Sequence, residues 1–208
     1  MFALVDKSDN SITRMLSGNK GITIGDNQYP KAIFNLWTES ERNAINIYTV
    51  EIDNSKFKDQ EWYINTNITY SFDGSKVTGS YGDATAKAHA DTNWTQKQID
   101  DGDAPDGADT DTVAIKGLKT VLIERVKSQA EGELNKTDWY ITRKSEKNTA
   151  IPSAITTHRD AVRTKQAEME TAITNASDTP ALETLFTYTT NESGVTSRPI
   201  GNIPTLEV

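Results

Sequence analysis

The chain has 208 residues, a hydrophobic fraction of 35% and a formal net charge of −8 at pH 7. This apolar content is below that of an ordinary globular domain, so we expect small cores in a chain that is elongated or completes its burial against partners. Lys and Arg are scattered among the acids, which argues against nucleic acid as a partner. No apolar run approaches the roughly 18 residues of a membrane span, and the first six residues do not resemble a signal peptide. Cysteine is absent, which excludes disulfides, thiolate metal sites and cysteine nucleophiles.

Residues 1–82 are predicted to form a β-rich N-terminal domain. Strands are predicted over residues 2–5 and 11–16, which flank a polar turn, and over residues 47–52 and 62–72, where apolar positions alternate. A polar turn at residues 8–10 joins the first two strands into an opening hairpin. Asp73-Gly74 precedes a further strand at residues 76–81, and Asp-Gly favours a tight hairpin turn because its central residues need positive φ.

One short helix is expected inside this domain. Thr38 is followed three residues later by Glu41, which is the pattern of a capping box, so the helix should begin at Glu39. Residues 18–25 contain three glycines but lack the strand–glycine–helix order of a nucleotide site. We therefore interpret that segment as a turn.

Residues 83–111 form an acidic segment with eight aspartates against Lys87 and Lys97. Self-repulsion and scarce apolar groups predict a linker or extended arm, with at most a turn of helix within residues 85–98. The aspartates from Asp101 to Asp111 also offer oxygen ligands for an ion such as Ca²⁺. An EF-hand loop opened at Asp101 would need Glu at its twelfth position, where this chain has Thr112. The solvated linker is therefore the favoured interpretation and the ion site the alternative.

From residue 112 the apolar period becomes helical. One face recurs over residues 115–134, and a second helix opens at Pro152 and carries Ile155, Val162 and Ile173 on its apolar side. Residues 179–186 predict a short third helix, and the Gly- and Pro-containing residues 187–208 predict an extended tail. The expected fold is α+β. A β-rich domain (1–82), an acidic linker (83–111), an antiparallel helical hairpin domain (112–186) and the tail follow one another.

No catalytic, cofactor or metal site is predicted. The only histidines, His89 and His158, fall in different parts of the chain, and no nucleophile elbow accompanies the many Ser and Thr residues. We expect Trp139 and Tyr140 to anchor the junction between the two long helices, because large rings supply much of the burial in a small core. The alternative is that they form a platform for sugars or bases. Around this junction we expect a structural set of five residues: Trp139, Tyr140, Arg143, His158 and Arg163.

The helical region carries a motif that resembles a known family. Its parts are, in chain order, Thr137-Asp138-Trp139-Tyr140 with Arg143, Ile151-Pro152, His158-Arg159 through Arg163, and Leu182 with Leu185-Phe186. Residues 117–186 resemble a C-terminal region that recurs in tailed-bacteriophage tail proteins and is described as tail-fibre-assembly or tail-assembly-chaperone-like. The N-terminal layout is similar to that of marine-phage structural proteins. This chain has His158 where tyrosine is more usual, which should alter the junction contact.

The resemblance implies a non-enzymatic structural component of a phage tail, such as a fibre, baseplate or adaptor subunit. Its partners would be other tail or fibre proteins, and it would occur in several copies or as a homo-oligomer. It would reside in the virion tail and, during assembly, in the host cytoplasm. One alternative is a fibre-assembly chaperone that is absent from the virion. Another is a carbohydrate-binding receptor module that uses exposed Trp62, Trp94 or Trp139.

Overall fold

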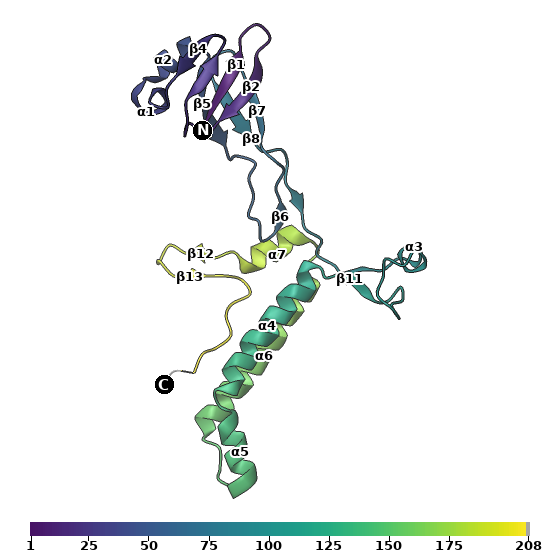
Figure 1. Ribbon diagram of the computed structural model, residues 1–208. Helices are drawn as coiled ribbons and strands as arrows, with labels where there is room; N and C mark the ends of the chain where they lie inside the picture. The colour runs from purple at the N-terminus through teal and green to yellow at the C-terminus, as the bar shows by residue number, and fades with distance from the viewer. Residues whose placement is uncertain (207–208) are drawn as a thin grey trace. The chain divides into compact units, whose positions relative to one another are not determined.

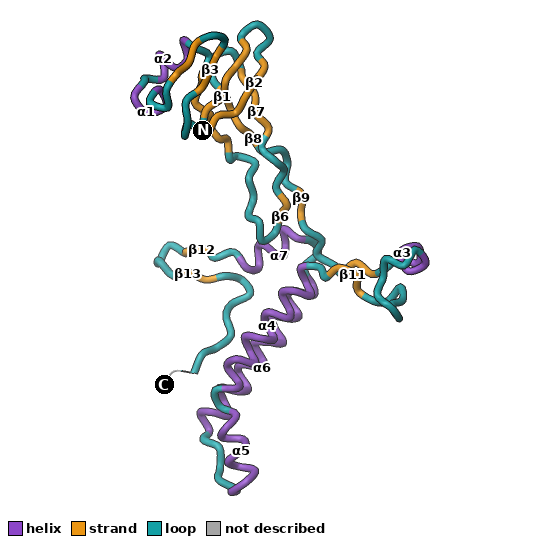
Figure 2. Tube along the Cα trace, viewed as in Figure 1, coloured by secondary structure: helices purple, strands orange, loops and turns teal. Residues whose placement is uncertain are grey.

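The computed structural model describes residues 1–206 and confirms the α+β class. The chain divides into two compact units, Met1–Thr85 and Ala86–Val208 (Figure 1). Strands dominate the first unit and helices the second (Figure 2).

The first unit is built on a five-stranded sheet with the strand order β2-β1-β5-β8-β7. Its elements are β1 (Phe2–Asp6), β2 (Ser11–Leu16), β3 (Ile22–Ile24), β4 (Asn27–Tyr29), α1 (Ile33–Leu36), α2 (Glu39–Ala44), β5 (Ile47–Asp53), β6 (Tyr63–Ile64), β7 (Thr69–Phe72) and β8 (Val77–Ser80). A two-residue strand, β9 (Thr85–Ala86), spans the division between the units. Strands β5 and β8 pair in parallel, and the other neighbours in the sheet are antiparallel.

Apolar side chains cover parts of both faces of this sheet. On one face the buried cluster consists of Ala3, Val5, Tyr48, Val50, Phe72 and Val77. The other buried cluster joins Ile47 to side chains from β3 and α1, namely Ile22, Ile33 and Phe34. Because successive residues of a strand point to opposite faces, Phe2 and Leu4 of β1 pack against this second cluster. The sheet also curls, so that its edge strands β2 and β7 approach each other.

Three local predictions for the first unit are confirmed. The opening hairpin is β1–β2, and Asp73-Gly74 lies in the turn of the β7–β8 hairpin with Gly74 at φ +97°. Helix α2 begins at Glu39 under a complete capping box, in which the Glu41 N–H donates to Thr38 Oγ1.

The single strand predicted over residues 62–72 is wrong, because the structure breaks it into β6 and β7. The side chain of Asn65 accepts a hydrogen bond from Lys58 N–H at 2.9 Å and donates one to the Lys58 carbonyl at 2.7 Å. Such local bonds between an Asn side chain and the backbone compete with a strand ladder. The glycine-containing segment 18–25 also holds more than a turn, since it includes β3.

The second unit is organised around two long antiparallel helices that lie side by side, α4 (Leu118–Asn135) and α6 (Ser153–Asn175) (Figure 1). Its other elements are β10 (Thr92–Asn93), α3 (Gln96–Asp100), β11 (Val113–Ile115), α5 (Asp138–Lys147), α7 (Thr179–Phe186), β12 (Thr189–Thr190) and β13 (Thr196–Ser197). The buried residues of the two long helices are Leu122, Val126 and Ala130 of α4 and Ile155, Arg159, Val162, Met169 and Ile173 of α6. The predicted hairpin and short third helix are confirmed, whereas α5 lies where no helix was predicted.

The acidic segment has more local structure than a free linker would. Strands β10 and β11 pair, and Thr95 and Gln98 form a capping box that starts α3. The Asp91 carboxylate accepts hydrogen bonds from Gly117 N–H at 2.7 Å and from the Thr120 hydroxyl at 2.8 Å, at the beginning of α4. These two bonds lower the pKa of Asp91. A carboxylate at this place also complements the positive end of the helix dipole.

The C-terminal tail is mostly extended, as predicted. It forms a small β12–β13 hairpin and then returns to the helical region, where Ile200 is buried and its N–H donates to the Leu185 carbonyl at 3.0 Å. The last two residues of the predicted tail, 207–208, lie outside the described residues.

Candidate functional site

The five residues predicted at the helical junction lie on two neighbouring elements. Trp139, Tyr140 and Arg143 belong to α5, and His158 and Arg163 belong to the first half of α6. The buried polar contact of this junction is made by Arg159.

Arg159 joins α6 to the break between α4 and α5. Its Nη1 donates to the Leu134 carbonyl at 2.8 Å, to Thr137 Oγ1 at 2.7 Å and to Asp138 Oδ1 at 2.7 Å. Arg159 is only 8% exposed and Thr137 is completely buried. Charged donors make the stronger class of hydrogen bonds, so this contact stabilises the turn of the chain from α4 into α5.

Trp139 and Tyr140 stack on each other at the start of α5. Their ring centroids are 3.8 Å apart with an interplanar angle of 33°, and the guanidinium carbon of Arg143 lies 4.6 Å from the Trp139 ring centroid. Trp139 is nonetheless 51% exposed. The rings therefore stabilise each other and hold Arg143 by cation–π attraction, but Trp139 does not fill a core between the long helices.

His158 and Arg163 have different surroundings. His158 is half-buried and close enough to Glu133 of α4 to contribute to the lowered pKa of that carboxyl, whose largest cause is the hydrogen bond from Lys136. Arg163 is exposed and pairs with Asp160 on its own helix, at 3.3 Å. An exposed pair of this kind contributes about 0–1 kcal/mol.

Helix α5 buries none of its side chains. Ile141 is 43% exposed. The helix begins with Asp138 and ends with Lys144 and Lys147 before Asn148, which adopts a left-handed conformation with φ 53°. A helix is favoured by an acidic residue in its first turn, basic residues in its last turn and an Asn at its C-cap. This pattern of residue types is the sequence signal that would have predicted α5.

The charges of α5 leave a basic surface beside the aromatic stack. Asp138 is engaged by Arg159, so the remaining charged side chains are Arg143, Lys144, Lys147 and a single acid, Glu146. Trp139, Arg143 and Lys147 follow one another at four-residue spacing and so lie along one side of the helix. In a chain with a net charge of −8 this local excess of cations is unusual. We call the side chains of Trp139, Arg143 and Lys147 on this side, together with the exposed Ile141 and Lys144 on the rest of the helix, the α5 surface.

The other sites predicted from the sequence have less structural basis. Among residues 1–206, no three His, Cys, Asp or Glu side chains are grouped so that they could hold a metal ion, and this includes the aspartates of 101–111. Trp62, one of the three aromatics considered for sugar binding, is only 4% exposed, so that assignment is wrong for Trp62. Within the same described range, no helix combines the length and apolarity needed to cross a membrane.

Comparison with known proteins returns no matching family model. No curated protein and no solved structure matches the chain either.

Proposed function

We propose that this protein is a non-enzymatic structural component of a tailed-bacteriophage tail, a fibre, baseplate or adaptor subunit that binds its neighbours through protein–protein contacts. The resemblance of residues 117–186 to phage tail proteins supports this context. The α5 surface supports the mode of action, because it presents the exposed Trp139 and Ile141 on a helical scaffold.

The observation that carries the proposal is that α5 is a ten-residue helix without a buried side chain, in which Trp139 and Ile141 are exposed. Helices shorter than about 12–15 residues are marginal in water, and most helical stability in proteins comes from packing an apolar face. Covering the exposed half of Trp139, about 100 Å², would contribute about 2–3 kcal/mol. A partner protein would supply the burial that α5 lacks within this chain.

The chemistry of the α5 surface defines the partner that it fits. The Trp139 ring, with Arg143 and Lys147 on the same side of the helix, is complementary to an apolar patch with an acidic rim. Tryptophan and arginine are also the residue types most enriched among the energetically dominant positions of protein interfaces. Opposite charges at the rim would raise the association rate and set the orientation of docking.

Mass spectrometry of purified, salt-washed particles tests the assignment to the tail. We expect the protein to be present in a reproducible molar ratio to the other tail proteins. Its absence from washed particles, together with co-purification with unassembled fibre protein, would instead identify a transient assembly chaperone and overturn the proposal.

A further inference from the structure

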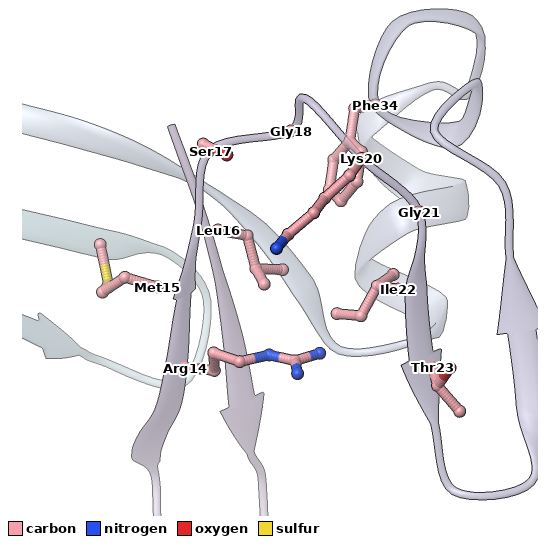
Figure 3. A pocket seen from close by; sticks show the side chains of 10 residues that line it. All are labelled: Arg14, Met15, Leu16, Ser17, Gly18, Lys20, Gly21, Ile22, Thr23 and Phe34. Atoms are coloured by element: carbon pink, nitrogen blue, oxygen red, sulfur yellow. The ribbon is translucent and has the colours of Figure 1, made fainter.

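The first unit contains a basic hollow of about 500 Å³ that is independent of the α5 surface. The end of β2, the loop after it, the start of β3 and one ring from α1 form its walls (Figure 3). The residues that line it are Arg14, Met15, Leu16, Ser17, Gly18, Lys20, Gly21, Ile22, Thr23 and Phe34. This volume lies within the range of small-molecule sites.

Two cations share this hollow without an acidic neighbour. The side chains of Arg14 and Lys20 both point into the space between β2 and β3, whereas Met15 points away from it (Figure 3). No carboxylate lines the hollow, and within residues 1–206 neither cation makes an ion pair or a side-chain hydrogen bond. Both side chains are exposed, so solvent screens their mutual repulsion, and an anion placed between them would be attracted by both.

The remaining wall of the hollow is apolar. Leu16 of β2, Ile22 of β3 and Phe34 of α1 line it, and Ile22 and Phe34 belong to the buried cluster on that face of the sheet. The hollow therefore combines a cationic end with an apolar wall.

Two glycines hold the loop in this shape. Gly18 has φ +72°, and a Cβ atom there would lie 2.9 Å from the Phe2 ring. A Cβ at Gly21 would lie 2.6 Å from the Tyr29 carbonyl oxygen. The loop therefore packs closely against Phe2 and Tyr29, so the shape of the hollow is formed without a ligand. A preformed site reduces the entropic cost of binding.

We propose that this hollow binds a small organic oxyanion, with its carboxylate or phosphate group between Arg14 and Lys20 and its apolar body against Leu16, Ile22 and Phe34. The planar guanidinium of Arg14 matches two oxygens of either head group, and Lys20 adds a second positive charge. The protein would thus carry a ligand site in its β-rich unit in addition to a docking surface in its helical unit.

Four probes test the site by NMR titration of the intact protein, read at the amides of Gly18, Gly21 and Phe34. Benzoate and phenyl phosphate carry both head and body, inorganic phosphate carries the head alone, and benzyl alcohol carries the body alone. We expect saturable shifts with millimolar dissociation constants for benzoate or phenyl phosphate, and at least about tenfold weaker binding of the other two. The ratio of the benzoate and phenyl phosphate constants identifies the preferred head group.

Variants distinguish specific binding from general attraction of anions. Arg14→Gln and Lys20→Gln should each weaken binding of the better probe about tenfold, whereas Lys7→Gln, with the same change of charge in the turn beyond the hollow, should not change it. Preserved amide spectra would show that each variant is folded. Equal binding of benzyl alcohol and benzoate, an equal effect of all three substitutions, or no saturable shift with any probe would overturn the proposal.

Discussion

Replacing Arg159 with methionine tests the most specific contact of the helical unit. Methionine keeps much of the aliphatic volume but removes the guanidinium that donates to the Leu134 carbonyl, Thr137 Oγ1 and Asp138 Oδ1. A hydrogen bond from a charged donor contributes about 1.5–3 kcal/mol. Leu134 would keep other donors, because the N–H and the hydroxyl of Thr137 also donate to its carbonyl, at 3.0 Å and 2.9 Å. We therefore expect Arg159→Met to lower the unfolding free energy of the helical unit by about 2–4 kcal/mol.

The companion variant Asp138→Asn separates the buried bonds from the ion pair. The Asp138 side chain is 53% exposed, so solvent screens its attraction to Arg159 and the expected loss is only about 0–1 kcal/mol. Urea unfolding followed by far-UV circular dichroism reports mainly on α4 and α6, and the transition should be fitted separately from that of the β-rich unit. Equal losses for the two variants, or no loss for Arg159→Met, would show that the buried bonds do not organise the junction.

Further predictions concern glycine and pH. Gly117→Ala at the N-cap of α4 should destabilise the helical unit by about 1–3 kcal/mol, because the new Cβ would lie 2.3 Å from the Ala90 carbonyl carbon. Gly132→Ala inside α4 meets no atom within 4 Å and should stabilise the unit by about 0.5–1 kcal/mol. Urea unfolding that gives the same sign for both variants would refute this contrast. The Lys76 N–H, followed by the Ser75 hydroxyl and N–H, lowers the pKa of Asp73 from its ordinary value of 3.8 to about 2. The stability that this turn gains should therefore be complete above pH 3.8 and lost as the pH falls through about 2, and an NMR titration that finds the Asp73 midpoint near 3.8 would contradict the turn geometry.

Much of the fold follows from signals that are local in the sequence. The β1–β2 and β7–β8 hairpins, the capped start of α2 and the apolar stripes of α4 and α6 each depend on residues close together in the chain. The parallel pairing of β5 with β8 could not be predicted in this way, because it joins distant segments through backbone bonds that carry no residue pattern. The sequence also does not show which apolar residues belong to which face of the sheet, because one face is covered by side chains of β3 and α1.

The candidate site was only partly accessible from the sequence. The aromatic pair Trp139–Tyr140 and its neighbour Arg143 are conspicuous as residue types, and the structure does bring them together. Their exposure is a tertiary property, since it depends on the direction in which α5 leaves α4. Arg159 lies on the buried side of α6, where charged residues are rare unless they are paired. Its partners at the break between α4 and α5 are known only from the structure.

Incorporation of α5-surface variants into particles tests the docking function most directly. The double variant Trp139→Ser, Ile141→Ser removes the exposed apolar groups of α5, and Val121→Ser is the matched control because Val121 is a comparably exposed apolar residue of α4. Circular dichroism should first show that all three proteins fold alike. In particles assembled with each protein, we predict that wild type and Val121→Ser are incorporated equally and that the double variant is depleted about tenfold or more, as expected from the loss of about 1.4 kcal/mol or more of contact energy. Equal incorporation of all three proteins would contradict the role of α5 as a docking surface.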